Sequence, residues 1–428
     1  MSILIKNAAI LSLDNEGKFS WLEGDIFIKG DIIEKIGRKL DVKADVVIDG
    51  KDKAAIPGFV NAHTHAAMTL FRGYADDLPL DIWLNKKIWP VEAKLTPEDV
   101  YWGVKLAILE MIKGGITAYG DMYFFMDEEA EAVKEAGIRA SLSVGLIAVS
   151  GDPSIKLKEA EDFVARWNGE AEGRITVMFG PHAPYTCPPD FLKEVVSAAE
   201  QYGVGIHTHL AETKKEVEDM YKLYGKSPVK VYEEAGVLNL HVLAAHCVHL
   251  TSDDIEILKN NEVFVVHNPQ SNLKLGSGVA PVPEMLKKGI SVALGTDGAA
   301  SNNNLDIFEE MRTAALLHKG INCDPTLVTA SEAVKMATLW GAEALGLKNV
   351  GRIEPGKKAD IVLLDFNAPH LQPKIDNLAQ IVYSAGSADV NTVIIDGKIV
   401  MKDREVLTLD EERIFKEVQK RVKRLISN

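Results

Sequence analysis

Short runs of apolar residues recur along most of the chain and alternate with longer amphipathic segments. The runs predict eight β-strands, at residues 59–60 (a buried run that also includes Ile56), 116–119, 140–144, 175–179, 204–207, 242–245, 263–266 and 291–294. Several of the intervening segments have helical periodicity, which is clear over residues 107–112. Eight β/α units over about 290 residues have the size of a (β/α)8 barrel. The pattern therefore predicts an α/β fold built on a TIM-type barrel.

Both ends of the chain have a different pattern, in which short β-branched runs are separated by glycine and aspartate. Such runs lie at residues 3–5, 9–11, 24–28 and 46–50, and again at 358–365 and 390–398. We expect the two ends to pair in one small β-sandwich domain. The predicted division is residues 1–56 for the first part of that domain, 57–350 for the barrel, and 351–428 for the second part with an amphipathic helix at about 410–426.

The composition is ordinary for a globular enzyme, with 46% hydrophobic and 26% charged residues. A net charge of −14 argues against a nucleic-acid partner or an anionic membrane. No apolar run approaches the roughly 18 residues of a membrane span, and the first residues do not form a signal peptide. The three widely spaced cysteines favour reduced thiols. We therefore expect a cytoplasmic protein, and the sequence leaves a homo-oligomer open.

Polar side chains that can bind a metal ion follow several of the predicted barrel strands. They are His63, His65, His209, His246 and Asp297. On an extended chain, residues two positions apart point to the same side, so His63 and His65 can bind one ion. Barrel active sites lie at the carboxyl ends of the strands. Imidazole and carboxylate ligands suit zinc, with iron or manganese as alternatives, so the sequence predicts a catalytic metal site.

A single histidine at a strand end is more often structural than catalytic. We assign five histidines mostly to that class: His207, His241, His249, His318 and His370. Glu212 is different, because it follows His209 by three residues and lies just past the strand. That position makes Glu212 a candidate catalytic residue.

These motifs resemble the amidohydrolase superfamily, and within it the deaminases that act on 5′-methylthioadenosine and S-adenosylhomocysteine. The likeness covers almost the whole chain, through residues 57–65, 68–73, 180–185, 207–213, 245–249, 267–275 and 295–302. It implies a metal-dependent hydrolysis that converts a 5′-modified adenosine into the inosine analogue and releases ammonia. The expected partner is thus a small nucleoside. The rival reactions are deamination of guanine and hydrolysis of a triazine, and a metal-free scaffold is the alternative outside enzymes.

The resemblance also implies a role for each matching residue. One divalent ion, with zinc as the best match, would be held by His63, His65, His209 and Asp297. Glu212 would shuttle protons to the purine ring, His246 would polarise the attacking water, and Asp297 would also take a proton from that water. Bound zinc lowers the pKa of water to about 7, which makes the nucleophile available at neutral pH. The strand at 175–179 has no lysine to bridge two metals, which favours a single ion.

The substrate contacts implied by the resemblance come from three further residues. Glu92 would bind the ribose hydroxyls, His182 would contact the substrate alongside Glu212, and Trp83 would pack against the nucleoside. One departure concerns relatives that bind the homocysteine carboxylate through arginines after the third strand, because this chain has none there. Lys156 or Lys158 would have to compensate. The expectation is a preference for 5′-methylthioadenosine, 5′-deoxyadenosine or adenosine over S-adenosylhomocysteine.

Overall fold

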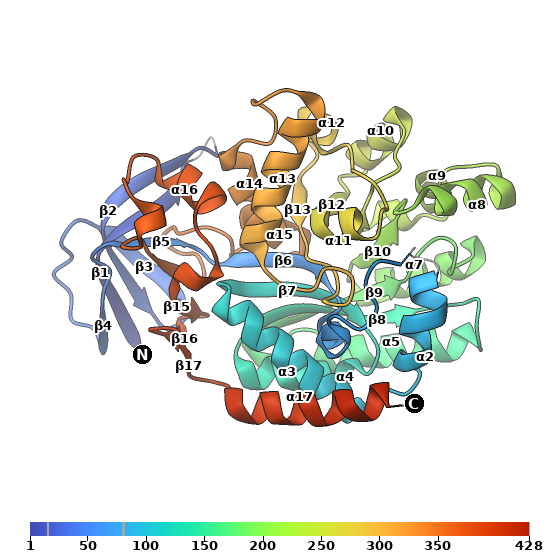
Figure 1. Cartoon of the computed structure of the whole chain (residues 1–428), viewed down its shortest axis with the longest axis horizontal. Coiled ribbons are helices and arrows are strands. Elements are labelled where there is room, and N and C mark those ends of the chain that lie inside the picture. The colour runs from blue at the N-terminus through green and yellow to red at the C-terminus, as the bar shows by residue number, and fades with distance from the viewer. Residues whose placement is uncertain (15–16, 79–81, 428) are drawn as a thin grey trace.

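The computed structural model of the chain describes residues 1–14, 17–78 and 82–427. Its centre is an eight-stranded sheet of parallel strands that follow one another in chain order. The strands are β6 (Phe59–Thr64), β7 (Ile116–Tyr123), β8 (Arg139–Leu146), β9 (Ile175–Pro181), β10 (Ile206–Leu210), β11 (Val242–His246), β12 (Phe264–His267) and β13 (Val292–Leu294). Figure 1 shows this sheet at the centre with helices around it. The predicted TIM-type barrel is confirmed.

Side chains and the loop after β13 bring the first and last strands of the barrel together. Asn61 on β6 accepts a hydrogen bond from the Thr296 backbone at 2.9 Å and donates from Nδ2 to the Thr296 hydroxyl at 2.7 Å. The Asp297 backbone N–H donates to the His63 carbonyl at 3.0 Å. These bonds place Asp297 beside His63, although 234 positions separate them.

Helices connect the strands and cover the outside of the barrel. The longer ones are α3 (Pro97–Lys113), α4 (Met126–Ala136), α5 (Pro153–Trp167), α7 (Pro189–Tyr202), α8 (Lys214–Tyr224), α10 (Ser252–Asn260), α13 (Ile307–Asn322) and α14 (Ala330–Ala337). Shorter ones are α2 (Trp89–Glu92), α6 (Glu170–Gly173), α9 (Pro228–Glu234), α11 (Pro269–Lys274), α12 (Val282–Lys287) and α15 (Leu339–Ala344). Helix α3 begins at a capping box of Thr96 and Asp99. It extends well beyond the clearest periodic stretch.

A second sheet is built from both ends of the chain. Its strands are β1 (Ser2–Leu13), β2 (Phe19–Lys29), β3 (Ile32–Gly37), β4 (Val46–Asp49), β5 (Lys53–Pro57), β14 (Ile361–Asp365), β15 (Val390–Ile395), β16 (Lys398–Lys402) and β17 (Glu405–Val406). The antiparallel pair β5–β14 joins the amino-terminal strands to the carboxy-terminal ones. Buried isoleucines, including Ile5, Ile28 and Ile361, form a core within this sheet. The predicted pairing of the two ends is thus confirmed.

The junction between the two sheets differs from the sequence expectation in one detail. Ile56 was expected in the same strand as Phe59, but it lies in β5 and pairs with β14. The chain crosses from one sheet to the other at Gly58, where a Cβ atom would lie 2.1 Å from the Thr117 hydroxyl. Only glycine fits this crossing. The division of the chain into domains at residues 57 and 350 stays a prediction.

A buried ion network ties the small sheet to the barrel. Arg139, at the start of β8, contacts Asp360 at 2.6 Å and Asp396 at 2.5 Å, and all three side chains are buried. Helix α17 (Glu411–Ile426) crosses back to the barrel and packs against α3 at the lower edge of Figure 1.

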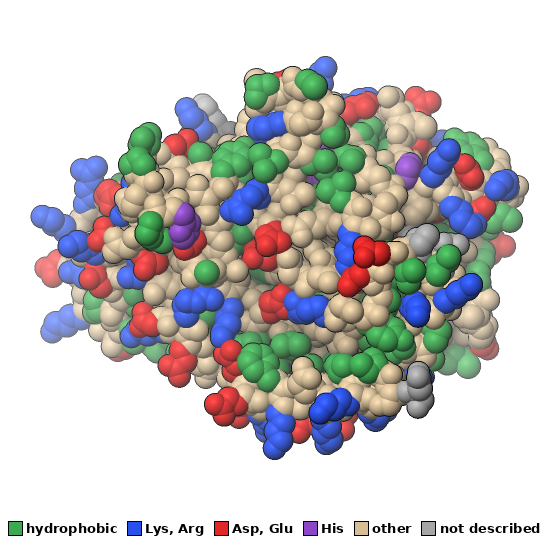
Figure 2. Space-filling view, in the orientation of Figure 1, with side chains coloured by type: hydrophobic (Ala, Val, Ile, Leu, Met, Phe, Trp, Pro, Cys, Tyr) green, Lys and Arg blue, Asp and Glu red, His purple; other side chains and the backbone are tan. Residues whose placement is uncertain are grey.

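The surface carries no single dominant charge on the face drawn in Figure 2. Lysine and arginine side chains are interspersed there with aspartate and glutamate. Among the helices of the described residues, none is long and apolar enough to cross a membrane. Helix α16 (Asn377–Tyr383), which lies between β14 and β15 in the chain, packs beside α14.

Candidate active site

The predicted site residues gather in one cavity at the carboxyl ends of the barrel strands. The cavity contains about 770 Å³ of space that no atom fills, part of which is open solvent. Its polar walls come from His65, His182, His209, Glu212, His246 and Asp297, and its apolar walls include Trp83, Leu84, Trp89, Phe124, Ile147 and Leu275. A polar floor under an apolar mouth is suited to a ligand with one reactive polar end.

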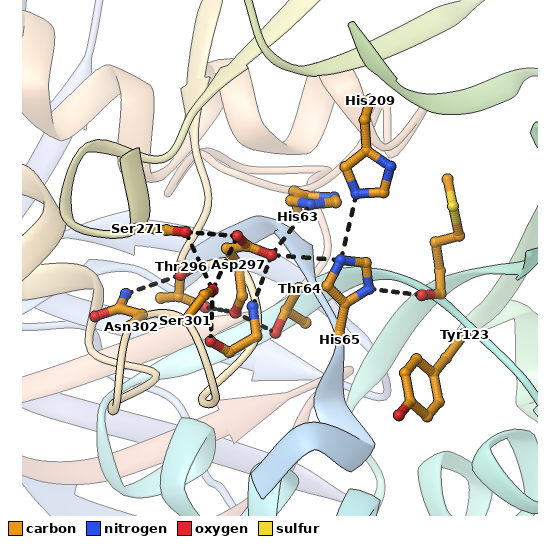
Figure 3. Close-up of polar contacts among 12 residues, drawn as sticks. His63, Thr64, His65, Tyr123, His209, Ser271, Thr296, Asp297, Ser301 and Asn302 are labelled. Atoms are coloured by element: carbon orange, nitrogen blue, oxygen red, sulfur yellow. Dashed lines mark hydrogen bonds and ion pairs between the residues drawn. The ribbon is translucent and has the colours of Figure 1, made fainter. Parts of the chain in front are cut away.

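The Nε2 atoms of three histidines and one carboxylate oxygen lie close together (Figure 3). Asp297 Oδ1 lies 3.6 Å from His63 Nε2 and 3.3 Å from His65 Nε2. His65 Nε2 is 3.3 Å from His209 Nε2. His63 Nε2 is buried and has no hydrogen-bond partner. An orphaned nitrogen among three other donor atoms fits a divalent ion, and the nitrogen and oxygen donors suit zinc.

Backbone carbonyls hold two of these imidazoles in orientation. His65 Nδ1 lies 2.7 Å from the Met122 carbonyl, and His209 Nδ1 lies 2.8 Å from the His182 carbonyl. A carbonyl oxygen only accepts, so each Nδ1 carries the hydrogen and each Nε2 presents its lone pair to the cavity. This arrangement is typical of histidines that bind a metal.

His63 is held by a second histidine and not by a carbonyl. Its Nδ1 lies 2.8 Å from His207 Nε2. Burial lowers the pKa of His63 to about 4, and burial also holds the pKa of His207 and of His209 well below the usual value. These rings are therefore neutral at pH 7, which is the state that binds a metal.

Two serine hydroxyls fix Asp297, which lies just after β13. Its Oδ2 accepts from Ser271 at 2.6 Å and from Ser301 at 3.0 Å, and its Oδ1 accepts from the Gly298 N–H at 2.8 Å. Burial would raise the pKa of Asp297, but the neighbouring side chains of His63, His65 and His246 hold it well below the usual value. The Asp297 carboxylate is thus ionised, which is the state that could bind a metal ion. The sequence analysis did not identify these two serines as site residues, although they lie in the runs 267–275 and 295–302 that resemble the family.

His246 and Glu212 face each other across the cavity floor. His246 Nε2 lies 3.9 Å from Glu212 Oε2, and the Ser277 hydroxyl donates to Glu212 Oε1 at 3.2 Å. His246 Nδ1 lies 2.8 Å from the amide oxygen of Asn272, which fixes the ring. Burial lowers the pKa of His246, but the Glu212 and Asp297 carboxylates outweigh that effect and raise it.

His246 also lies within metal-ligand distance, although the sequence placed it outside the ligand set. Its ring nitrogen, with those of His63 and His209, forms a group whose atoms are all within 4.8 Å of one another. A second such group is His63, His65 and Asp297. The predicted ligands therefore lie together, and His246 completes the wall of the metal site.

Glu92, His182 and Trp83 line the same cavity, as expected for substrate contacts. Burial raises the pKa of Glu92 to about 7, against a hydrogen bond from Tyr123 that lowers it. The Tyr123 hydroxyl donates to Glu92 Oε1 at 2.5 Å. Nothing in the sequence singled out Tyr123, which comes from β7 while Glu92 comes from α2. His182 is anchored through Nδ1 to the Thr186 hydroxyl at 3.0 Å.

The two lysines considered for a carboxylate partner lie elsewhere. Lys156 pairs with Glu159, and Lys158 pairs with Asp162 on the exposed side of α5. Among the described residues that line the cavity, none is a lysine or an arginine.

Four of the five histidines assigned to structural roles have partners outside the proposed ligand set, whereas the fifth, His207, contacts His63. His241 and His249 lie next to backbone carbonyls at 2.8 and 2.7 Å. His318 pairs with the buried His267, and His370 pairs with Asp389. The cysteines in the described residues are all free.

Comparison with known proteins places the chain among metal-dependent hydrolases. The amidohydrolase family matches residues 54–400. A 5-methylthioadenosine/S-adenosylhomocysteine deaminase of Pelotomaculum thermopropionicum is 54% identical over 100% of this chain and 99% of the relative. The structure of a zinc-bound adenosine deaminase from Xanthomonas campestris superposes with a TM-score of 0.95, at 36% identity over 99% and 98% of the two chains. A zinc-bound atrazine chlorohydrolase from Arthrobacter aurescens gives a TM-score of 0.91 at 25% identity, over 98% of this chain and 100% of the other.

Proposed function

This chain belongs to the amidohydrolase family, and we propose how the residues of its active site carry out the reaction. The reaction is the hydrolytic deamination of 5′-modified adenosines. The observation that carries the proposal is the single cavity in which His63, His65, His209 and Asp297 converge beside Glu212 and His246. A scaffold protein without a metal would not require these ligand and proton-transfer groups to converge. The cofactor is one divalent metal ion, with zinc as the best match.

Two residues would handle protons at the reacting carbon. A bound divalent ion would activate a water molecule for attack on the purine carbon that carries the amino group. His246, fixed by Asn272, would hold that water through Nε2. Glu212 would give a proton to the ring nitrogen as the water oxygen bonds to the carbon, and Asp297 would accept a proton from the water and pass it to the departing amino group. Ammonia would then leave, and Glu212 would take back the remaining hydroxyl proton as the carbonyl forms.

The apolar mouth of the cavity would receive the 5′ side of the nucleoside. Leu84, Phe124 and Ile147 offer it dispersion contacts and no charge partner. The carboxylate of a homocysteine tail would be desolvated there without an arginine to bind it. We therefore propose that 5′-methylthioadenosine and 5′-deoxyadenosine are better substrates than S-adenosylhomocysteine.

A substrate panel tests this assignment. Ammonia release is measured from 5′-methylthioadenosine, 5′-deoxyadenosine, adenosine, S-adenosylhomocysteine, guanine and a triazine. We expect kcat/KM on 5′-methylthioadenosine to exceed that on S-adenosylhomocysteine by about 10-fold or more, because an unpaired buried group costs roughly 1–3 kcal/mol. Equal values for the two would contradict the apolar-mouth argument. Faster turnover of guanine or the triazine than of any nucleoside would overturn the substrate class.

The Glu92→Ala variant tests ribose recognition. An ionised carboxylate that already accepts from Tyr123 can still accept from ribose hydroxyls, since each oxygen accepts two bonds. Each charge-assisted bond contributes roughly 1.5–3 kcal/mol, so kcat/KM on adenosine should fall by one to several powers of ten. The loss on 2′,3′-dideoxyadenosine should be small, because that substrate lacks the 2′- and 3′-hydroxyls that Glu92 would bind. Equal losses on both substrates would remove Glu92 from ribose binding.

The pH dependence of the wild type gives a second measure of the same contact. The pKa of Glu92 is raised to about 7, so the carboxylate becomes protonated as the pH falls through 7. The preference for adenosine over the dideoxy analogue should therefore shrink below pH 7. Taking the ratio of the two kcat/KM values cancels the titration of the metal site, which both substrates share.

The setting of the enzyme is a further part of the proposal. Free cysteines in the described residues and a net charge of −14 support a cytoplasmic enzyme with a small-molecule partner. A homo-oligomer stays a prediction.

A further inference from the structure

Glu216 is a buried carboxylate next to the active site that the proposed chemistry does not use. It lies in the first turn of α8, and 4% of its surface is exposed. Its side chain turns back along the chain to the turn that follows β10. The Ala211 N–H donates to Oε1 and the Glu212 N–H donates to Oε2, each at 2.8 Å. One carboxylate thus binds both backbone donors of the turn that carries Glu212.

The same turn is held from its other side by the turn that carries His246. The Leu210 carbonyl accepts from the Cys247 N–H at 3.0 Å, and the Ala211 carbonyl accepts from the backbone N–H groups of residues 248 and 249 at 3.1 and 2.9 Å. Ala211 has a φ of 50°, in the left-handed region that alanine rarely adopts. The turn therefore depends on tertiary hydrogen bonds. The Glu216 carboxylate accepts the bonds from the N–H groups of the turn.

Other helices of this chain show what a carboxylate at this helix position ordinarily does. In α3, α10 and α14 the N-cap threonine and the third helical residue form a reciprocal capping box. In α8 the Thr213 hydroxyl accepts from the Glu216 N–H at 3.1 Å, as in those helices. The Glu216 carboxylate, however, reaches past its own N-cap to the two residues before it. A capping group has been diverted to the active-site turn.

We propose that Glu216 is a positioning residue that fixes the Glu212 carboxylate opposite His246. The inference rests on the proposed role of Glu212 in proton transfer. The Glu212 carboxylate accepts a hydrogen bond from Ser277 at 3.2 Å and faces His246 at 3.9 Å, and its backbone N–H is held by Glu216. Loss of that anchor would let the turn relax and move the Glu212 carboxylate off the line to the ring nitrogen. A displacement of about 1 Å at a reacting group can cost about 100-fold in rate.

The test is Glu216→Gln in the metal-loaded enzyme. Glutamine keeps the shape, but its NH2 group faces one of the two backbone donors, so one bond is lost. We expect kcat to fall by about 10- to 100-fold while KM, metal content and melting temperature change little. If Glu216→Gln does not fold, Glu216→Asp replaces it in the test. The shorter aspartate cannot reach both donors, so kcat should fall by a similar factor. The matched control is Glu332→Gln, at the same helix position in α14, which should leave kcat unchanged.

A double-mutant comparison separates positioning from a general structural effect. If Glu216 acts through Glu212, then Glu216→Gln should cost almost nothing in an enzyme that already carries Glu212→Gln. A multiplicative loss in that background would overturn the proposal. Normal activity of Glu216→Gln would overturn it as well. Near-normal activity of Glu212→Gln alone would instead refute the proposed function of Glu212, so the two failures are distinguishable.

Discussion

Glu212→Gln should lower kcat by about 10²–10⁴ and leave the metal in place. Glutamine keeps the size and the hydrogen bond from Ser277 but cannot carry a proton, and a positioned general acid–base group contributes a factor of that size. Glu212 is not among the groups whose atoms lie within ligand distance of one another. Steady-state kinetics on 5′-methylthioadenosine, with zinc measured on the same sample, gives the result.

The matched control for this variant is Glu218→Gln on the outer side of α8. The Glu218 side chain is half exposed and pairs loosely with Lys214 at 3.8 Å, so its loss should leave kcat and metal content at the wild-type value. Loss of zinc in Glu212→Gln would make Glu212 a ligand. Activity near that of the wild type would exclude it as the proton shuttle.

His209→Ala should abolish both zinc binding and turnover. The His209 ring reaches the centre of the ligand set from β10, where its Nδ1 is fixed by the His182 carbonyl. Without this ring the ion would lose one of its four proposed ligands, and a metal-activated water would no longer be available at neutral pH. We expect about one divalent ion per wild-type chain and almost none in the variant, measured by elemental analysis.

His241→Ala is the matched control for the metal experiment. His241 lies just before β11, at the opposite end of that strand from His246, and contacts the Ala344 carbonyl at 2.8 Å. Its removal should leave zinc content unchanged. Two tightly held ions per wild-type chain would contradict a mononuclear site. Full activity in a wild-type protein free of metal would contradict metal dependence altogether.

Hydrophobic periodicity was sufficient to predict the barrel because every barrel strand is buried. The run at 242–245 corresponds to β11, which extends by one residue to His246. The run at 204–207 was shifted, since β10 begins at Ile206 and continues to Leu210. Strand ends depend on partners in neighbouring strands, which periodicity does not report. Ile56 shows the same limit, because only its pairing with β14 assigns it to the small sheet.

The convergence of the candidate metal ligands was predictable because their chemical type and their place at a strand end are both local properties. His63, His65 and His209 are recognisable as imidazoles at strand ends, and barrel geometry then requires such ends to meet. In the structure the Nε2 atoms of His65 and His209 lie 3.3 Å apart. The sequence thus determined the fold class and the identity of the reactive groups.

Only the tertiary structure decided how those groups are held. Ser271 on Asp297, Tyr123 on Glu92 and Glu216 at the Glu212 turn are ordinary polar residues by sequence. A hydrogen bond depends on distances of about 3 Å and on donor direction, and such distances arise only when separate strands and helices pack. Residue type and spacing determine what chemistry is present, and packing determines which partner orients it.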